Sequence, residues 1–366
     1  MAGPSPLMLK ACQYYYSKDP LTMAQIGSRL GISRHRVGRL LREAIETGVV
    51  KIEIQSSRSK SMEIEQALEN AFDLKASLVV EVNPDLSSQD TKLATCKAGA
   101  EFLRELIKAH HTIGVGWGTT TFELINQLEP LGIRDATVVQ ITGGNKRLSV
   151  QFDCHEVTRR LAQKLSTEPV LLYAPGVVDN KETRELLMRE SAIADTFRYF
   201  DKLDIVVVGI GAIVPKVNSM LIGSGYVSGA ELKLLKRGGA VGDVFSYFIN
   251  EKGEIVHTEF YDRSITIGVH HIRKVPTTVG IATGVEKSRA VAAAIRGGFV
   301  NTLIVDSQLA QALLEHCAPR VESGHIGEEA NTAARVRRRS VVDTRYRSPD
   351  RAADRQFTSF NKRSQT

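Results

Sequence analysis

Residues 22–41 of this 366-residue chain read TMAQIGSRLGISRHRVGRLL, and they decide the fold of its N-terminal part. Apolar side chains recur here at the spacing with which two short, closely crossing helices would face each other. Gly27 leaves room for the crossing, Gly31 supplies a turn residue with positive φ, and Ser33 can cap the second helix. The stretch therefore predicts a helix-turn-helix. Its expected apolar contacts are Ile26, Leu30, Ile32, Val37 and Leu40.

The outward face of the second helix is polar and cationic. Arginine and histidine donors suit guanine edges and phosphates in a major groove. A solvated basic face without a DNA role is the alternative, but the apolar spacing, the glycine and the basic face agree with one another. The candidate DNA-binding residues are Ser33, Arg34, His35, Arg36 and Arg39.

Two further segments complete the expected DNA-binding domain, residues 1–57. Residues 9–16 are expected to form a packing helix. Residues 49–54, VVKIEI, alternate like a short strand that would form a wing or a closing edge.

Length and composition indicate at least two domains, because 42% hydrophobic residues in 366 can fill a core larger than the N-terminal part needs. The longest apolar run, residues 205–214, is too short for a bilayer span, and no secretory signal is recognised. The four cysteines contain no C-x-x-C pair, which fits a reduced cytoplasm and argues against zinc. We therefore expect a cytoplasmic chain without membrane contact, metal or cofactor. The cysteines are Cys12, Cys96, Cys154 and Cys317.

The net charge of +7 is concentrated after Cys317, where eleven Lys or Arg stand against six Asp or Glu. This tail, residues 319–366, lacks apolar periodicity and is predicted to be disordered. Its basic cluster at 335–339 could touch nucleic acid non-specifically, but a solvated extension is the favoured interpretation.

The middle of the chain, residues 58–318, alternates strand-like runs with helical patterns, beginning with a helix at 59–72. Such alternation predicts an α/β domain with a mostly parallel, doubly wound sheet. Ligands of these sheets bind at the carboxyl ends of strands. The expected strands are 76–82, 111–115, 136–141, 170–173, 204–209, 277–282 and 302–306.

The first chemically suggestive loop is GVGWGTTT at 114–121, which ends a strand and opens a helix at 119–127. Its glycines let the backbone approach an anion, and a helix N-terminus with threonine hydroxyls supplies donors. A dinucleotide site would want an acidic residue after the next strand, where TGG stands at 142–144 instead. A glycine turn used only for packing is the remaining alternative.

Three other segments carry candidate ligand contacts. TGGNKR at 142–147 brings Lys146 near the anion, with Gln151 beyond it. TGVEK at 283–287 places Lys287 in the first turn of a helix, against its dipole, where a bound anion would compensate; an exposed surface lysine is the alternative. Asp243, after a glycine turn, could accept sugar hydroxyls or serve as a turn residue.

Several motifs resemble the SorC-type sugar-responsive transcriptional regulators, over about residues 7–316. They are GWGTT at 116–120, VGIGA at 208–212, GAVGD at 239–243 and VGIATGVEK at 279–287, followed by AAIRGG. The resemblance implies an effector domain similar in fold to sugar-phosphate isomerases and deaminases, which senses a phosphorylated sugar or polyol without turnover. It also implies tetramers. The tail after 319 departs from the family.

Position by position, the resemblance puts Thr119 and Thr120 on the phosphate. It puts Gly143, Gly144 and Gln151 around the sugar, Asp243 on hydroxyls and Lys287 on the anionic or hydroxyl end. The complete set of expected effector-binding residues is Gly116, Gly118, Thr119, Thr120, Thr121, Gly143, Gly144, Lys146, Gln151, Asp243, Glu286 and Lys287.

The sequence thus predicts a non-enzymatic regulator of a sugar or polyol operon. Its expected partners are double-stranded operator DNA, a phosphorylated sugar or polyol, and further copies of the chain. The alternative is a sugar-phosphate isomerase or deaminase with a DNA-binding head, which would need a general base from Asp153, Glu156 or Asp243. An architectural DNA-binding protein would leave the glycine loops unused.

Overall fold

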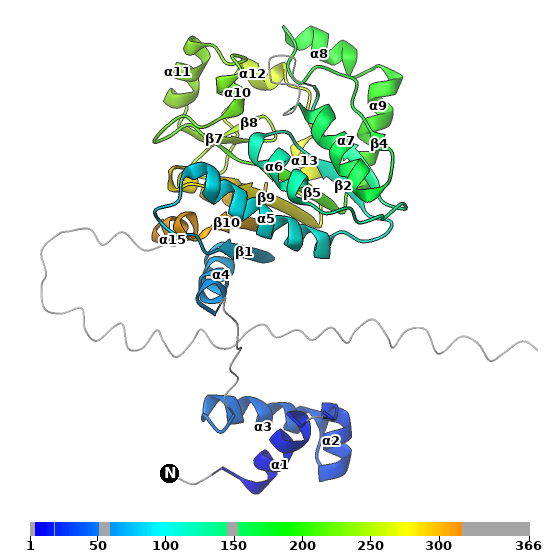
Figure 1. The fold of residues 1–366 in the computed structure, drawn as a ribbon, viewed down its shortest axis with the longest axis vertical. Helices are drawn as coiled ribbons and strands as arrows, with labels where there is room; N and C mark the ends of the chain where they lie inside the picture. Colours follow the sequence, from blue (N-terminus) through cyan, green and yellow to red (C-terminus); the bar gives the residue numbers. More distant parts are fainter. Residues whose placement is uncertain (1–3, 18, 51–58, 145–152, 317–366) are drawn as a thin grey trace, which may run out of the picture. The chain divides into compact units, whose positions relative to one another are not determined.

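The computed structural model describes residues 4–17, 19–50, 59–144 and 153–316 (Figure 1). Most of the strand expected at 49–54, Lys146, Gln151 and the tail at 319–366 lie outside these ranges. Val49 and Val50, the described part of that expected strand, are half-buried against the N-terminal core and belong to no strand.

The N-terminal helices form the predicted helix-turn-helix: α1 (Pro6–Tyr15), α2 (Met23–Leu30) and α3 (Arg34–Glu46). Gly31 ends α2 with φ 67°, and the Ser33 hydroxyl accepts the Arg36 N–H at 3.2 Å. A Cβ at Gly27 would lie 2.7 Å from the Ile32 carbonyl oxygen, so only glycine allows this close turn. Ile26 and Val37 are fully buried between the helices.

Seven parallel strands form the main sheet, in the order β1-β10-β9-β5-β2-β3-β4. Six of the seven expected strands are confirmed to within two residues at each end. The strands are β1 (Ala76–Val80), β2 (Thr112–Val115), β3 (Thr137–Gln140), β4 (Pro169–Val170), β5 (Ile205–Gly209), β9 (Thr277–Ala282) and β10 (Thr302–Asp306).

The expected strand at 170–173 is wrong in its extent, because β4 ends at Val170. The Gln140 side chain takes over the role of a neighbouring strand there: its Oε1 accepts the Leu172 N–H at 3.1 Å. The Ala174 N–H then donates to the Leu172 carbonyl, which turns the chain out of the sheet.

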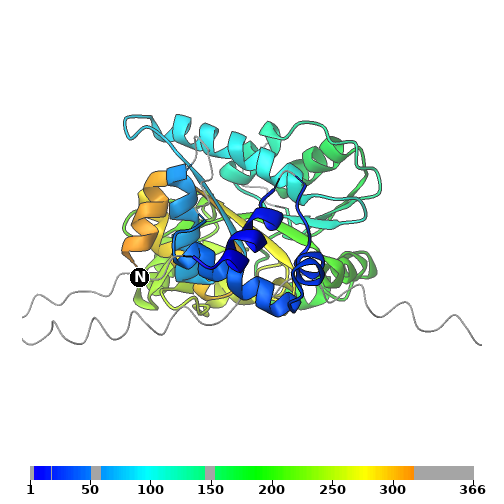
Figure 2. The same cartoon turned by 90° about the horizontal axis from the view of Figure 1, so that it is seen from below.

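Helices cover both faces of the sheet, as a doubly wound fold requires. Strand residues alternate between the two cores: Ile205 and Val207 pack beneath α5, α6 and α7, whereas Val206 and Val208 face the core that α4, α14 and α15 close. The α4 and α15 ribbons lie side by side in Figures 1 and 2. The bounds are α4 (Ser59–Phe72), α5 (Ser88–Leu106), α6 (Thr119–Gln127), α7 (Cys154–Leu165), α14 (Ser288–Arg296) and α15 (Ser307–Glu315).

Shorter helices fill the connections. They are α8 (Lys181–Leu187), α9 (Ser191–Phe197), η2 (Arg198–Lys202), α10 (Met220–Gly223), α11 (Gly229–Arg237), α12 (Glu259–Asp262), α13 (Val269–Ile272) and η3 (Val285–Lys287). Among the described helices, none is long and apolar enough to cross a membrane.

A small antiparallel sheet follows β5 directly: β6 (Gly211–Ala212), β7 (Ala240–Val244) and β8 (Tyr247–Asn250). Gly242 lets β7 pack against α14, because a Cβ there would collide with the Cβ of Ala290. The register pairs Asp243 with Gly211. The small sheet therefore holds a carboxylate over the carboxyl end of β5.

The outer edge of β1 is covered by α4 through carboxylates. Glu69 Oε1 accepts the Ser77 N–H at 2.7 Å, and Glu65 Oε1 accepts the Val79 N–H at 2.8 Å. These are β1 donors that β10, on the other side, does not use.

A chain that ends at Cys317 is expected to unfold at the same temperature as the full chain, within about a degree. The last described helix, α15, already closes the core with Leu309, Ala310 and Leu313 fully buried. Differential scanning calorimetry on both chains measures this, with Leu313→Ala as the control for a lost core contact. A clear drop in the truncated chain would contradict the prediction.

Candidate effector pocket and DNA interface

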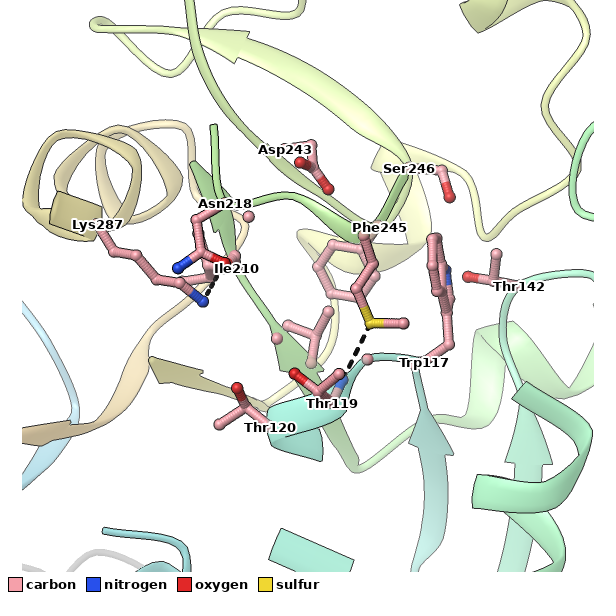
Figure 3. Close-up of a pocket in the computed structure, with 16 residues that line it drawn as sticks. Trp117, Thr119, Thr120, Thr142, Ile210, Asn218, Asp243, Phe245, Ser246 and Lys287 are labelled. Carbon is pink, nitrogen blue, oxygen red and sulfur yellow. Dashed lines mark hydrogen bonds between the residues drawn. The ribbon is translucent and has the colours of Figure 1, made fainter. Parts of the chain in front are cut away.

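The site lies where the strand order reverses. After β2 the chain builds β3 and β4 toward one edge, and then returns to place β5 on the other side of β2. Loops leaving the carboxyl ends of two such strands diverge and open a crevice. A pocket of about 580 Å³, counted to its open mouth, occupies this place (Figure 3).

One end of the pocket is the N-terminus of α6. Gly118 precedes the helix with φ 137°, and no side chain caps its first amides. The Thr119 N–H donates instead to the Met220 sulfur, at 3.2 Å (Figure 3). Amides without a side-chain cap and the helix dipole make this end suitable for an anion.

The opposite wall carries a buried carboxylate. Asp243 is 8% exposed, and its Oδ1 has no hydrogen-bond partner in the described part of the chain. Burial raises the pKa of this carboxyl from 3.8 to about 6, against the opposing effects of a hydrogen bond from Ser219 and the charge of Lys287. Oδ1 lies against Gly211, where a Cβ would force the carboxylate to shift. Asp243 lines the pocket, and a carboxylate with an unused acceptor in a pocket wall suits a ligand hydroxyl.

Lys287 is not an exposed surface residue, because only 8% of it is accessible. Its predicted place in the first turn of a helix is also corrected: it ends η3, and α14 begins at Ser288. The ammonium donates to the Ile210 carbonyl at 2.9 Å. Burial lowers the pKa of Lys287, while the charges of Asp243 and Glu286 act in the opposite direction. Lys287 thus brings a cation to the wall of the pocket (Figure 3).

The structure brings part of the expected effector set to the pocket and leaves part outside it. The residues that line it are Gly116, Gly118, Thr119, Thr120, Asp243 and Lys287. Lys146 and Gln151 lie outside the described residues.

Four expected residues are described but do not line the pocket. The Thr121 hydroxyl is fully buried and faces Gly209 at the end of β5, since the helix turns it away from the opening. Glu286 instead accepts a hydrogen bond from Asn218 at 3.0 Å. Gly143 packs on the backbone at Pro175, and Gly144 packs on the His155 ring, so both serve close chain contacts.

The helix-turn-helix presents the expected basic face. Arg34, His35, Arg36 and Arg39 are all exposed on α3, whereas Val37 and Leu41 of the same helix are buried. No ion pair within the described ranges neutralises these three arginines. Their charges therefore remain available to a polyanion.

The chain is similar to known regulators over most of its length. Residues 56–315 match the Sugar-bind family, described as "Putative sugar-binding domain". It is 30% identical to the transcriptional regulator LsrR of Enterobacter sp. (strain 638) over 82% of this chain and 90% of that protein. It is 29% identical to the deoxyribonucleoside regulator of Bacillus subtilis (strain 168), over 84% and 97%. The chain belongs to the SorC family of sugar-binding regulators.

A solved member extends this likeness to the fold. The full-length sorbitol operon regulator SorC from Klebsiella pneumoniae superposes with a TM-score of 0.65 at 29% identity, over 84% of this chain and 98% of that one. The predicted fold class, a helix-turn-helix followed by a doubly wound effector domain, is thereby confirmed.

Sequence reasoning missed several residues of this SorC-family pocket. Trp117 lies within the quoted GWGTT motif and could have been noticed, because it is the single tryptophan of the chain. Asn218 and Met220 carry no sequence signal. Lys92 of α5 also acts here: its charge lowers the pKa of Lys287. It lies one turn before Cys96, whose thiol donates to the Thr120 carbonyl.

The bases considered for an enzyme are mostly engaged elsewhere. Asp153 caps α7 and contacts His155 at 2.9 Å, and Glu156 pairs with Arg160 at 2.6 Å. Neither lines the pocket, so Asp243 is the remaining candidate of the three. Within the described ranges, no cluster of three His, Cys, Asp or Glu could hold a metal.

Asp243→Asn is expected to make the ligand-free protein less sensitive to pH between about 4 and 7. With a pKa near 6 in the fold and 3.8 otherwise, Asp243 contributes stability that is present below pH 4 and is lost as the pH rises through 6. From pH 4 to pH 7, the free energy of unfolding of the Asn variant should therefore rise relative to that of the wild type by about 2–3 kcal/mol. Urea unfolding at several pH values measures it. A difference in free energy of unfolding between the two proteins that does not change with pH would contradict the burial of an ionisable Asp243.

Proposed function

We propose that this SorC-family protein is a transcriptional regulator that binds operator DNA through α3 and is controlled by a phosphorylated sugar or polyol. The observation that carries the effector class is the pairing, in one pocket, of an uncapped helix N-terminus with a buried, unpartnered carboxylate oxygen. An anion fits the first, and a hydroxyl donor fits the second. A phosphorylated sugar or polyol carries both groups on one small molecule.

Different pocket residues bind different groups of the ligand. The amides and hydroxyls of Thr119 and Thr120 hold the phosphate, and Lys287 adds a positive charge. Asp243 accepts hydrogen bonds from hydroxyls, and the Trp117 ring lines the same pocket. Charge-assisted bonds of this kind contribute about 1.5–3 kcal/mol each, which favours phosphorylated over free sugars.

On DNA, α3 lies in the major groove, with Ser33 fixing its first turn and the basic residues reaching bases and phosphates. Two N-terminal domains of a homo-oligomer, a tetramer by the family resemblance, bind two half-sites. The protein works in the cytoplasm, where its operator is. Effector binding changes operator affinity by favouring one arrangement of the DNA-binding domains, a coupling of typically 1–3 kcal/mol.

The pocket senses its ligand and does not convert it. The sorbitol operon regulator of Klebsiella pneumoniae and the deoxyribonucleoside regulator are both named as regulators, which supports a sensor. Only one of the three candidate bases lines the pocket, which supports it too.

A panel of sugar and polyol phosphates, with the matching free sugars, tests the proposal. Trp117 is the single tryptophan and lines the pocket, so its fluorescence reports occupancy directly. We expect a phosphorylated compound to bind saturably and to form no product. The bound compound should also alter the affinity of the protein for the DNA upstream of the protein's own operon. Turnover of the bound compound would favour the enzyme, and equal binding of the free sugar would remove the phosphate from the proposal.

A further inference from the structure

The start of α10 reaches the anion end of the pocket through one side chain. The Met220 sulfur accepts the Thr119 N–H at 3.2 Å, shown dashed in Figure 3. The two residues before it bond elsewhere: the Asn218 amide donates to Glu286 Oε1 at 3.0 Å, and the Ser219 hydroxyl caps α10 by accepting the Ile222 N–H at 3.4 Å. Met220 alone of the three thus contacts the expected phosphate position.

The Met220 contact resembles that of a ligand in kind but is weaker. A thioether sulfur is a weak acceptor, whereas a phosphate oxygen at the same amide would form a charge-assisted bond. Asp243 Oδ1 has no partner among the described residues, so the internal contacts satisfy the pocket only in part.

The Met220 side chain can move without loss of the fold. Asn218 is fixed to β6 by two backbone bonds with Ala212, of 2.8 and 2.9 Å. Leu221 is 1% exposed in a separate cluster with Ile213 and Val227, which anchors the other side of α10. Between these two fixed points, Met220 is only half-buried. Its flexible side chain can leave the Thr119 amide by rotation alone.

We propose that Met220 is a built-in competitor for the effector: its sulfur occupies the phosphate position at the Thr119 amide in the free protein and is displaced when the effector binds. This inference rests on the proposed function and specifies its regulation. Effector affinity is then set partly by a segment of the chain itself. The rotated Met220 side chain is the local change that occupancy produces.

Removal of the competitor should strengthen binding, whereas removal of a true ligand contact should weaken it. The test uses inorganic phosphate as the probe, the full chain, Trp117 fluorescence as the readout, and sodium chloride at equal ionic strength as the blank. Met220→Ala is expected to tighten phosphate binding about three- to tenfold, the size of one weak hydrogen bond. Met188→Ala, which removes a half-buried methionine on the distant α8 region, is the matched control and should change nothing.

Thr120→Val separates this inference from the proposed function. If Thr120→Val lowers the affinity for phosphate while Met220→Ala leaves that affinity unchanged or lowers it, the competitor proposal is wrong and the anion site stands. If Thr120→Val also leaves phosphate binding unchanged, the proposed site itself fails.

A second measurement needs no functional variant. The chain has six methionines, and ¹³C-methyl labelling gives each a separate signal, with Met220 assigned by its loss in Met220→Ala. Phosphate should shift the Met220 methyl signal of the wild-type chain and leave that of Met188 in place. A Met220 signal that stays fixed at saturating phosphate would overturn the displacement.

Discussion

Replacement of Arg34, Arg36 and Arg39 together by alanine is expected to lower operator affinity at least a hundredfold, with the fold intact. All three are exposed on α3 and have no ion pair in the described part of the chain, so their removal costs the fold little. Each arginine that reads a base contributes about 1–3 kcal/mol, and about 3 kcal/mol in total corresponds to that loss. Fluorescence anisotropy with labelled operator DNA measures it.

The salt dependence distinguishes phosphate contacts from base contacts. Each neutralised phosphate that is lost should flatten the log–log slope of affinity against salt by about 0.9. Lys10→Ala, an exposed charge on α1, is the matched control within the same domain. Full operator affinity in the triple variant would show that α3 does not recognise the DNA.

The double variant Thr120→Val, Lys287→Met is expected to bind a phosphorylated effector at least a hundredfold more weakly. Thr120→Val keeps the shape of the side chain and removes a hydroxyl, and Lys287→Met keeps an unbranched chain and removes the charge. Two lost donors of about 1.5–3 kcal/mol each give this factor. Isothermal titration calorimetry with the compound found in the panel measures it. Operator binding without effector should stay as in the wild type.

Thr121→Val is the matched control for that experiment. Thr121 adjoins Thr120 on α6, yet its hydroxyl is fully buried, without a partner in the described residues, and it lines no part of the pocket. Its loss should leave effector affinity unchanged. Equal effects of Thr120→Val and Thr121→Val would mean that the substitutions act through helix packing, and the anion site would have to be moved.

Elements with strong local signals could be predicted from the sequence. The strands at 277–282 and 302–306, and the helix at 119–127, have the bounds that apolar runs and turn residues indicated. The motif positions Thr119 and Thr120 line the pocket because they follow the carboxyl end of a parallel strand, β2. Asp243 joins them through the pairing of β7 with β6, which follows β5 directly.

Features that depend on distant residues could not be predicted. The burial of Lys287 could not be predicted, although its place in the pocket was, since its carbonyl partner, Ile210, lies 77 positions away in the chain. The early end of β4 depends on the Gln140 side chain, which no local pattern reports. Met220 has no motif at all: its place at α6 follows from the whole path of the chain after β6.

The carboxylate-covered edge of β1 limits how copies of this chain can associate. Glu65 and Glu69 already hold the N–H groups that an incoming strand would need, and at the opposite edge β4 has two residues, one of them Pro169 without an N–H. Neither edge of this sheet therefore offers the free backbone N–H groups that a strand of another chain would need to pair with it. Among the described residues, copies that associate at the margins of this seven-stranded sheet would therefore do so by contacts between side chains. Such interfaces can change by single substitutions while the hydrogen-bonded framework around the ligand stays the same.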